Sequence, residues 1–212
     1  MDVYRTEEEQ LAALRDWWKE NGRSAVLGVV LGLAAVFGWR AWQTHELNSA
    51  EAASALYQAL VGAVRTSAID KAGNTAAELQ QRFADTPYAI FTAMIQARLA
   101  VDAGDLDAAA GHLRTALAKN KDPALKSEIR LRLARVLTSQ DKHDEALALL
   151  AGAPGAFEAV YDELRGDIEA GRGRMEAART AYERALTQTR ATGGATDALE
   201  VKLAVLGPKP PA

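Results

Sequence analysis

The sequence predicts an all-α protein with a single N-terminal transmembrane helix followed by a short α-solenoid of stacked helical hairpins. Three observations predict this fold. An apolar run near the N-terminus has a tryptophan pair on each side, and later apolar residues recur at helical spacing between regularly placed turns. In addition, 49% of the 212 residues are apolar, and the helix-favouring residues Ala, Leu, Glu and Arg are abundant.

Composition also argues against several classes of function. The net charge is −3 and no arm or face concentrates Lys and Arg, so no nucleic-acid partner is expected. The chain has no cysteine, which excludes disulfides, thiolate catalysis and Cys-ligated zinc.

The apolar run extends from Ala25 to Trp39 without an ionisable or amide side chain. The tryptophans of the chain flank it as membrane-interface anchors: Trp17, Trp18, Trp39 and Trp42. A helix from Trp18 to Trp39 is roughly 31 Å long, which matches the hydrocarbon core of a bilayer and places the pairs at opposite interfaces. We therefore expect a transmembrane helix over 24–44, after an N-terminal segment 1–23.

A cleaved signal peptide and a buried core helix are the alternative interpretations of this run. The preceding segment is acidic rather than short and basic, and no small-residue cleavage site follows the run closely. A core helix has no need of tryptophans at both ends. These points favour an uncleaved anchor.

The orientation of the anchor follows from its flanking charges. Arg15, Lys19 and Arg23 precede the run, whereas Arg40 is the single cation between Trp39 and Val64. The positive-inside bias predicts a cytoplasmic N-terminus and an exported, periplasmic domain over 45–206 of a bacterial inner-membrane protein.

Small residues form a stripe within the predicted span. Gly28 and Gly32 make a G-x-x-x-G pattern that Ala35 continues, and such a stripe lets another helix approach closely. The alternative is that glycine is simply common in membrane helices.

Three turn-and-helix segments repeat in the second half of the chain, over 103–117, 139–150 and 170–186. Each carries an alanine followed four residues later by a large apolar residue: Ala109 and Leu113, Ala146 and Leu150, Ala178 and Tyr182. Two helices that pack closely need a small residue at their crossing and a large one beside it. The spacing therefore predicts repeated helical hairpins.

Each repeated segment follows another predicted helix, over 88–103, 124–140 and 157–170. These helices carry Ala97, Ala134 and Gly166 at the corresponding crossing position. A first pair over 50–67 and 74–83, a capping helix over 197–206 and a flexible tail over 207–212 complete the prediction.

The repeated segments resemble tetratricopeptide repeats, although they lack that family's Trp near each repeat start, and "AGAP" ends one second helix early, at Ala153. The layout of nearly the whole chain, from "EEEQLAALRDWWKENG" through one span to "YAIFTAMIQARLAVDAGDLDAAAGHLRTAL" and "YDELRGDIEAGRGRMEAARTAY", resembles the YfgM-like family of ancillary SecYEG translocon subunits. The resemblance implies an inner-membrane protein with a periplasmic repeat domain that cooperates with the membrane-anchored chaperone PpiD near the translocon exit.

No catalytic, cofactor or metal motif is present in the sequence. His45, His112 and His143 are far apart, and the string "GRGR" at 171–174 is interpreted as a repeat turn rather than a phosphate loop. We therefore expect a protein that is not an enzyme and takes no cofactor.

A repeat solenoid acts through its surface, and in tetratricopeptide repeats the first helix of each pair lines the concave face. That register predicts a partner-binding groove of mixed chemistry, suited to a polypeptide: Phe91, Met94, Arg98, Leu131, Arg135, Glu163 and Asp167. The alternative for Leu131 is burial in the core between helices.

These observations predict a membrane-tethered protein-interaction scaffold that holds partner proteins near the export channel, where confinement raises their effective concentration. Its partners would be protein or peptide clients, the translocon with its chaperone, and membrane lipid. Two alternatives remain open: a tethered scaffold for cell-envelope assembly or division, and a regulator that sequesters a cytoplasmic signalling protein.

Overall fold

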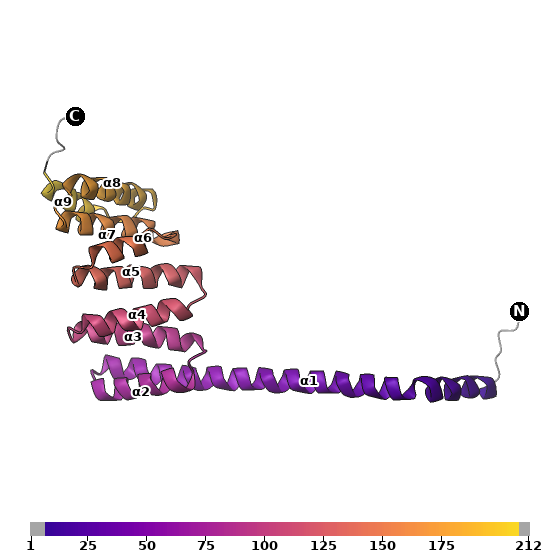
Figure 1. The fold of residues 1–212 in the computed structure, drawn as a ribbon. Coiled ribbons are helices and arrows are strands. Elements are labelled where there is room, and N and C mark those ends of the chain that lie inside the picture. Colours follow the sequence, from indigo (N-terminus) through magenta and orange to yellow (C-terminus); the bar gives the residue numbers. More distant parts are fainter. Residues whose placement is uncertain (1–6, 208–212) are drawn as a thin grey trace, which may run out of the picture. The chain divides into compact units, whose positions relative to one another are not determined.

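The computed structural model describes residues 7–207, and every regular element in that range is helical (Figure 1). The predicted segment 1–23 and tail 207–212 therefore lie partly outside the described residues. The elements are α1 (Glu7–Arg65), α2 (Ile69–Arg82), α3 (Pro87–Asp102), α4 (Leu106–Lys119), α5 (Pro123–Ser139), α6 (His143–Leu150), a short 3₁₀ helix η1 (Gly155–Phe157), α7 (Glu158–Gly171), α8 (Met175–Ala191) and α9 (Asp197–Val205). The chain divides into two compact units, Met1–Ala52 and Ala53–Ala212, and α1 contributes to both.

The first unit contains the apolar run as part of α1. The most hydrophobic window of this helix has a mean hydropathy of 1.7, and 0% of it is buried. A core helix would be covered by other elements, so the interpretation of the run as a buried core helix is wrong. Its length and composition are those of a candidate membrane span.

The helix α1 corrects one predicted boundary. We expected a separate helix to begin at residue 50, but α1 continues without a break to Arg65. Between Gly38 and Gly62 the sequence has neither glycine nor proline, so nothing ends the helix there.

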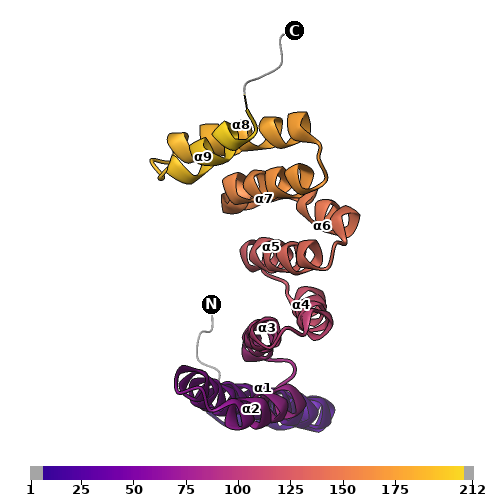
Figure 2. The same cartoon turned by 90° about the vertical axis from the view of Figure 1, so that its left-hand side faces the viewer.

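The second unit is a stack of helical hairpins. The end of α1 pairs with α2, α3 with α4, α5 with α6 and α7 with α8, and α9 packs on α8 (Figure 1). Figure 2 shows α3, α5 and α7 following one another on one side, with α4 and α6 on the other. The main contacts between elements in the described range join helices that are neighbours, or next but one, along the chain.

Four turns inside the hairpins have the same backbone conformation. Ser67, Gly104, Asp141 and Gly173 have φ values of 54°, 79°, 60° and 74°. In each turn this residue and the next donate backbone hydrogen bonds to carbonyls three and five residues earlier. The interpretation of "GRGR" as a repeat turn is therefore confirmed, because Gly173 supplies the left-handed conformation that the turn requires.

The first turn of the stack differs from the prediction. The helix expected over 74–83 begins five residues earlier, at Ile69, because the chain reverses at Ser67 with φ 54°. A serine in this conformation gives no clear signal in the sequence.

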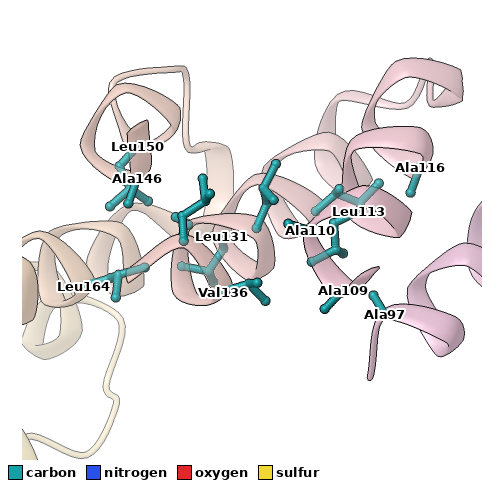
Figure 3. Packing of buried hydrophobic residues seen from close by; sticks show 14 of the residues in the cluster. Ala97, Ala109, Ala110, Leu113, Ala116, Leu131, Val136, Ala146, Leu150 and Leu164 are labelled. Atoms are coloured by element: carbon teal, nitrogen blue, oxygen red, sulfur yellow. The ribbon is translucent and has the colours of Figure 1, made fainter. Parts of the chain in front are cut away.

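Small residues lie at the crossings of the paired helices, as predicted. Five of them are buried alanines and one is a buried glycine: Ala97, Ala109, Ala134, Ala146, Ala178 and Gly166. Figure 3 shows Ala97, Ala109 and Ala146 in the apolar cluster. The large partners Leu113, Leu150 and Tyr182 are at most 4% exposed. The expected role of these positions in close helix packing is therefore confirmed.

The hairpin of α5 and α6 is shortened. Helix α6 ends at Leu150, three residues before the predicted Ala153, and η1 connects it to α7. The Tyr161 hydroxyl donates a 2.8 Å hydrogen bond to the Ser127 carbonyl, and Ser127 Oγ donates to the Ala153 carbonyl at 3.1 Å. These bonds tie the irregular segment to the neighbouring helices.

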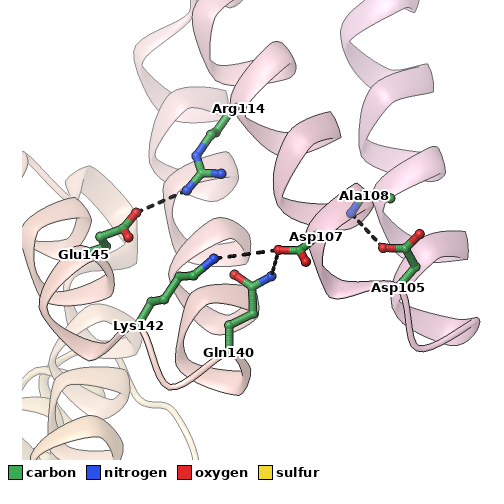
Figure 4. A network of polar contacts seen from close by, with 7 residues as sticks. All are labelled: Asp105, Asp107, Ala108, Arg114, Gln140, Lys142 and Glu145. Atoms are coloured by element: carbon green, nitrogen blue, oxygen red, sulfur yellow. Dashed lines mark hydrogen bonds and ion pairs between the residues drawn. The ribbon is translucent and has the colours of Figure 1, made fainter.

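Polar contacts join neighbouring hairpins on their exposed side (Figure 4). Asp107 in α4 accepts a 2.9 Å hydrogen bond from Gln140, and Arg114 lies 3.1 Å from Glu145 in α6. The Asp105 carboxylate caps α4 by accepting from the Ala108 backbone N–H at 2.9 Å. Exposed ion pairs of this kind contribute about 1 kcal/mol or less, so the buried apolar cluster holds the stack together.

Candidate functional site

A hollow of about 230 Å³ lies between α3 and α5, above α4. Its lining combines an apolar floor with arginines: Met94, Ala97, Arg98, Val101, Leu106, Leu113, Arg132, Arg135, Val136 and Ser139. The hollow brings together Met94, Arg98 and Arg135, which the repeat register predicted as groove residues on two separate helices.

The arginines give this hollow a cationic rim. Arg98 makes a weak 3.7 Å ion pair with Asp102, and Arg132 pairs with Glu128 on its own helix. The Arg135 guanidinium has no hydrogen-bond or ion-pair partner among residues 9–207. A cation beside an apolar floor can receive a carbonyl or carboxylate whose neighbouring side chain fills the hollow.

Seven residues that line this hollow were not among the predicted groove residues, and Val101 and Arg132 are two that a partner could contact. Val101 is 42% exposed although it is a large apolar residue, and Arg132 lies one turn before Val136. Both follow the spacing of the predicted residues along their helices, so a wider stripe of each helix would have included them.

Phe91 and Leu131 lie elsewhere. Phe91 lines a second hollow of about 810 Å³ formed with the α2–α3 and α4–α5 loops, and its ring centroid is 6.1 Å from that of Tyr57. Leu131 is 4% exposed and belongs to the main apolar cluster. The alternative that Leu131 is buried in the core between helices is therefore confirmed.

Glu163 and Asp167 are engaged within the chain. Lys202 of α9 places its Nζ 2.7 Å from a Glu163 oxygen and 2.6 Å from an Asp167 oxygen. Asp167 also accepts a 2.8 Å hydrogen bond from the Tyr182 hydroxyl. These two predicted groove residues are therefore paired with a lysine of the capping helix and are not open to a partner in this structure.

The same contacts shift two pKa values. Burial lowers the pKa of Lys202, but hydrogen bonds and charge attraction from Asp167 and Glu163 outweigh it, so the pKa lies above its ordinary value. Burial, with the hydrogen bond to Asp167, raises the pKa of Tyr182. Both groups therefore hold their protons firmly in the folded protein.

The candidate membrane segment exposes its predicted residues. The ring centroids of Trp17 and Trp18 are 6.4 Å apart, those of Trp39 and Trp42 are 5.1 Å apart, and all four side chains are at least 50% exposed. A Cβ on Gly28 or Gly32 would have no neighbour within 4 Å, and Ala35 is exposed beside them. The small-residue stripe is thus uncovered within the described chain.

Among the residues that the structure describes, no group of three or more His, Cys, Asp or Glu side chains is placed to hold a metal ion. The three histidines lie in α1, α4 and α6.

Comparisons with known proteins give consistent similarities. A family model described as "Tetratricopeptide repeat-like domain" matches residues 15–208. A protein of Haemophilus influenzae named "Ancillary SecYEG translocon subunit" is 36% identical over 185 residues, covering 86% of this chain and 90% of the relative. A protein of the same name from Escherichia coli is 35% identical over 187 residues, covering 86% and 88%, and one from Neisseria gonorrhoeae is 26% identical over 205 residues, covering 96% and 98%.

Proposed function

Since the chain belongs to the family of ancillary SecYEG translocon subunits, which carry a tetratricopeptide repeat-like domain, we propose that it is a membrane-tethered scaffold for protein interactions at the translocon. The names of the relatives and the repeat fold mark it as a scaffold, not an enzyme.

One observation supports polypeptide binding most directly: the hollow between α3 and α5 joins an apolar floor to the Arg135 guanidinium, which has no partner among the described residues. A bound segment would place one apolar side chain against Met94 and Val101. It would direct a carbonyl or carboxylate oxygen to Arg135, since a charge-assisted hydrogen bond is stronger than a neutral one.

The anchor defines where this contact acts in the proposal. Residues 24–44 span the inner membrane, residues 1–23 are cytoplasmic and residues 45–206 are periplasmic, as the flanking charges favour. Tethering confines the repeat domain near the export channel, so a weak contact is occupied more often than in free solution. Clients are exported polypeptides, handled together with the chaperone PpiD.

Site-specific crosslinking tests the client proposal. A photoreactive phenylalanine analogue replaces Val101 in the hollow, and the control replaces Ile69, which is 59% exposed in α2 and outside the hollow. Irradiation of the full chain in cells should join the Val101 probe to exported polypeptides or to PpiD, and the Ile69 probe should not be joined. Capture of only division or cell-wall proteins by the Val101 probe would instead support the envelope-assembly alternative.

A charge reversal then tests the role assigned to Arg135. The variant Arg135→Glu should reduce crosslinking from residue 101 about tenfold or more, since loss of a charge-assisted contact costs about 1.5–3 kcal/mol. The matched control Arg184→Glu changes an exposed cation of α8 and should leave crosslinking unchanged. Equal crosslinking in both variants would remove Arg135 from the site.

A topology reporter tests the orientation. A periplasm-active enzyme fused after residue 212 should be active, and a cytoplasm-active one should be silent. The reverse result would support the regulator of a cytoplasmic protein, because the repeat domain would then lie on that side.

A further inference from the structure

A groove of about 520 Å³ runs along one face of α1 at the beginning of the apolar run. It changes from cationic to apolar along its length and is lined by Trp18, Lys19, Gly22, Arg23, Val26, Leu27 and Val30. Within the described part of the first unit no other element covers it, and the proposed scaffold function makes no use of it.

Gly22 forms the notch of this groove. A Cβ on residue 22 would lie 3.3 Å from Cε2 and Nε1 of Trp18, so the indole lies against the glycine backbone. Gly22 is accordingly buried although its neighbours on the helix are exposed. A larger residue would displace the indole and fill the notch.

Lys19 and Arg23 lie one turn apart on the cationic part of the groove. Lys19 makes a 3.2 Å ion pair with Asp16, and the two side chains are 69% and 72% exposed. Because so exposed an ion pair is weak, a stronger anionic partner can replace the carboxylate of Asp16. Arg23 has no ion-pair or hydrogen-bond partner in the described range. Arg15, a further turn before Lys19, adds a third cation to the same face.

The apolar part of the groove continues toward the centre of the run. Val26, Leu27 and Val30 are at least 50% exposed. In the proposed span, the cations and Trp18 lie at the headgroup level of the cytoplasmic leaflet, and these side chains lie at the depth of the acyl chains.

We propose that this groove binds one anionic phospholipid of the cytoplasmic leaflet, a site that rests on the proposed membrane span. Lys19 and Arg23 hold the headgroup phosphate, whose negative charge in an anionic lipid is not neutralised by a cationic group on the same headgroup. One acyl chain passes Gly22 beneath the Trp18 indole and lies along Val26, Leu27 and Val30. The change from cationic to apolar surface follows the change from phosphate to hydrocarbon in the lipid, which a neighbouring apolar helix would not match.

Fluorescence quenching by brominated lipid tests the site in the full chain. The substitutions Trp17→Phe, Trp39→Phe and Trp42→Phe leave Trp18 as the reporter, and the protein is reconstituted into vesicles of phosphatidylglycerol and phosphatidylcholine. The vesicle composition stays constant, and bromine is carried on the acyl chains of either the first lipid or the second. Quenching of Trp18 should show a preference for phosphatidylglycerol of about fivefold in relative association, the factor that one Lys or Arg contributes near an anionic lipid.

Three variants and a second reporter complete the test. The preference should be lost in Arg23→Gln with Lys19→Gln, which removes the charges, and in Gly22→Leu, which fills the notch. The matched control Gly28→Leu also enlarges a glycine of α1 but lies outside the groove, so the preference should remain. A reporter that keeps only Trp39, at the other end of the run, should be quenched without headgroup preference.

The outcomes separate the lipid site from the span itself. If neither reporter is quenched by either lipid, the helix is not inserted and the proposed span fails. If Trp18 is quenched equally by both lipids while Trp39 is quenched normally, the helix spans but the groove has no selective site. If Trp39 is quenched and Trp18 is not, a second copy of the helix covers the groove and the lipid proposal is overturned.

Discussion

Gly166 in α7 and Tyr182 in α8 are packed so closely that a Cβ on residue 166 would lie 2.3 Å from Cε1 of the tyrosine ring. Tyr182 is 4% exposed, and its hydroxyl is fixed 2.8 Å from Asp167. The ring therefore cannot move aside without losing its packing and this hydrogen bond, and only glycine fits at this crossing.

The first prediction concerns that crossing. The variant Gly166→Ala should lower the free energy of unfolding by about 2 kcal/mol, because overpacking costs more than the higher helix propensity of alanine returns. Urea unfolding measures the change. The control Gly111→Ala, at an exposed position of α4 with no neighbour within 4 Å, should instead be stabilised by about 0.5–1 kcal/mol. An equal change in the free energy of unfolding in both variants would contradict the close packing at residue 166.

A second prediction concerns the attachment of α9. The variant Lys202→Met should destabilise the chain by about 1–2 kcal/mol, because it leaves Glu163 and Asp167 without their shared cation. Amide hydrogen exchange should accelerate in α9 more than in α3. The control Lys71→Met removes an exposed lysine of α2 and should change neither quantity. Uniform acceleration in all helices would mean that Lys202 supports the whole fold rather than α9.

Alkaline pH should weaken the same attachment. The pKa values of Lys202 and Tyr182 are raised on folding above their ordinary values of 10.5 and 10.0. Their contribution to stability is therefore fully present below about pH 10 and is lost as pH rises through the folded pKa values. Thermal unfolding followed from pH 8 to 12 should show this decline, and the double variant Lys202→Met with Tyr182→Phe should show a shallower one. If stability declined with pH equally steeply in the double variant, groups other than Lys202 and Tyr182 would cause the decline.

The membrane anchor gives a fourth prediction. The double variant Leu31→Arg with Leu33→Arg places two charges in the exposed apolar run, each costing about 3 kcal/mol at the centre of a span. Extraction with alkaline carbonate should leave the unmodified chain in the membrane fraction and release the variant. Leu47→Arg, outside the run but similarly exposed, should stay with the membrane. Release of the unmodified chain would exclude an anchor.

Much of the hairpin stack was predictable because its signals are local. Helix α3 begins one residue before the predicted start and ends one residue before the predicted end, since a proline opens it and a Gly-Asp turn closes it. The crossing residues were predictable for the same reason, because a small residue recurs at one register in each hairpin.

The remaining features depend on information that is not local. The turn at Ser67 has no glycine to indicate it, and the continuous α1 lacks any breaker at residue 50. The contact of Lys202 with Glu163 joins residues 39 positions apart and depends on how α9 packs, which no spacing rule gives. The sequence could thus predict which helix positions belong to the groove register. It could not predict which of these side chains are open to a partner, which are buried in the core and which are paired within the chain.

The neighbour-to-neighbour contacts of the stack have a consequence for its biogenesis. Since α3 packs on α4 and α7 on α8, each hairpin can settle once its own stretch has been synthesised and released, without waiting for the last residues. A chain that crosses a membrane from its anchored end would therefore become ordered one hairpin after another. The helix α9 would dock last, with Lys202 contacting Glu163 and Asp167.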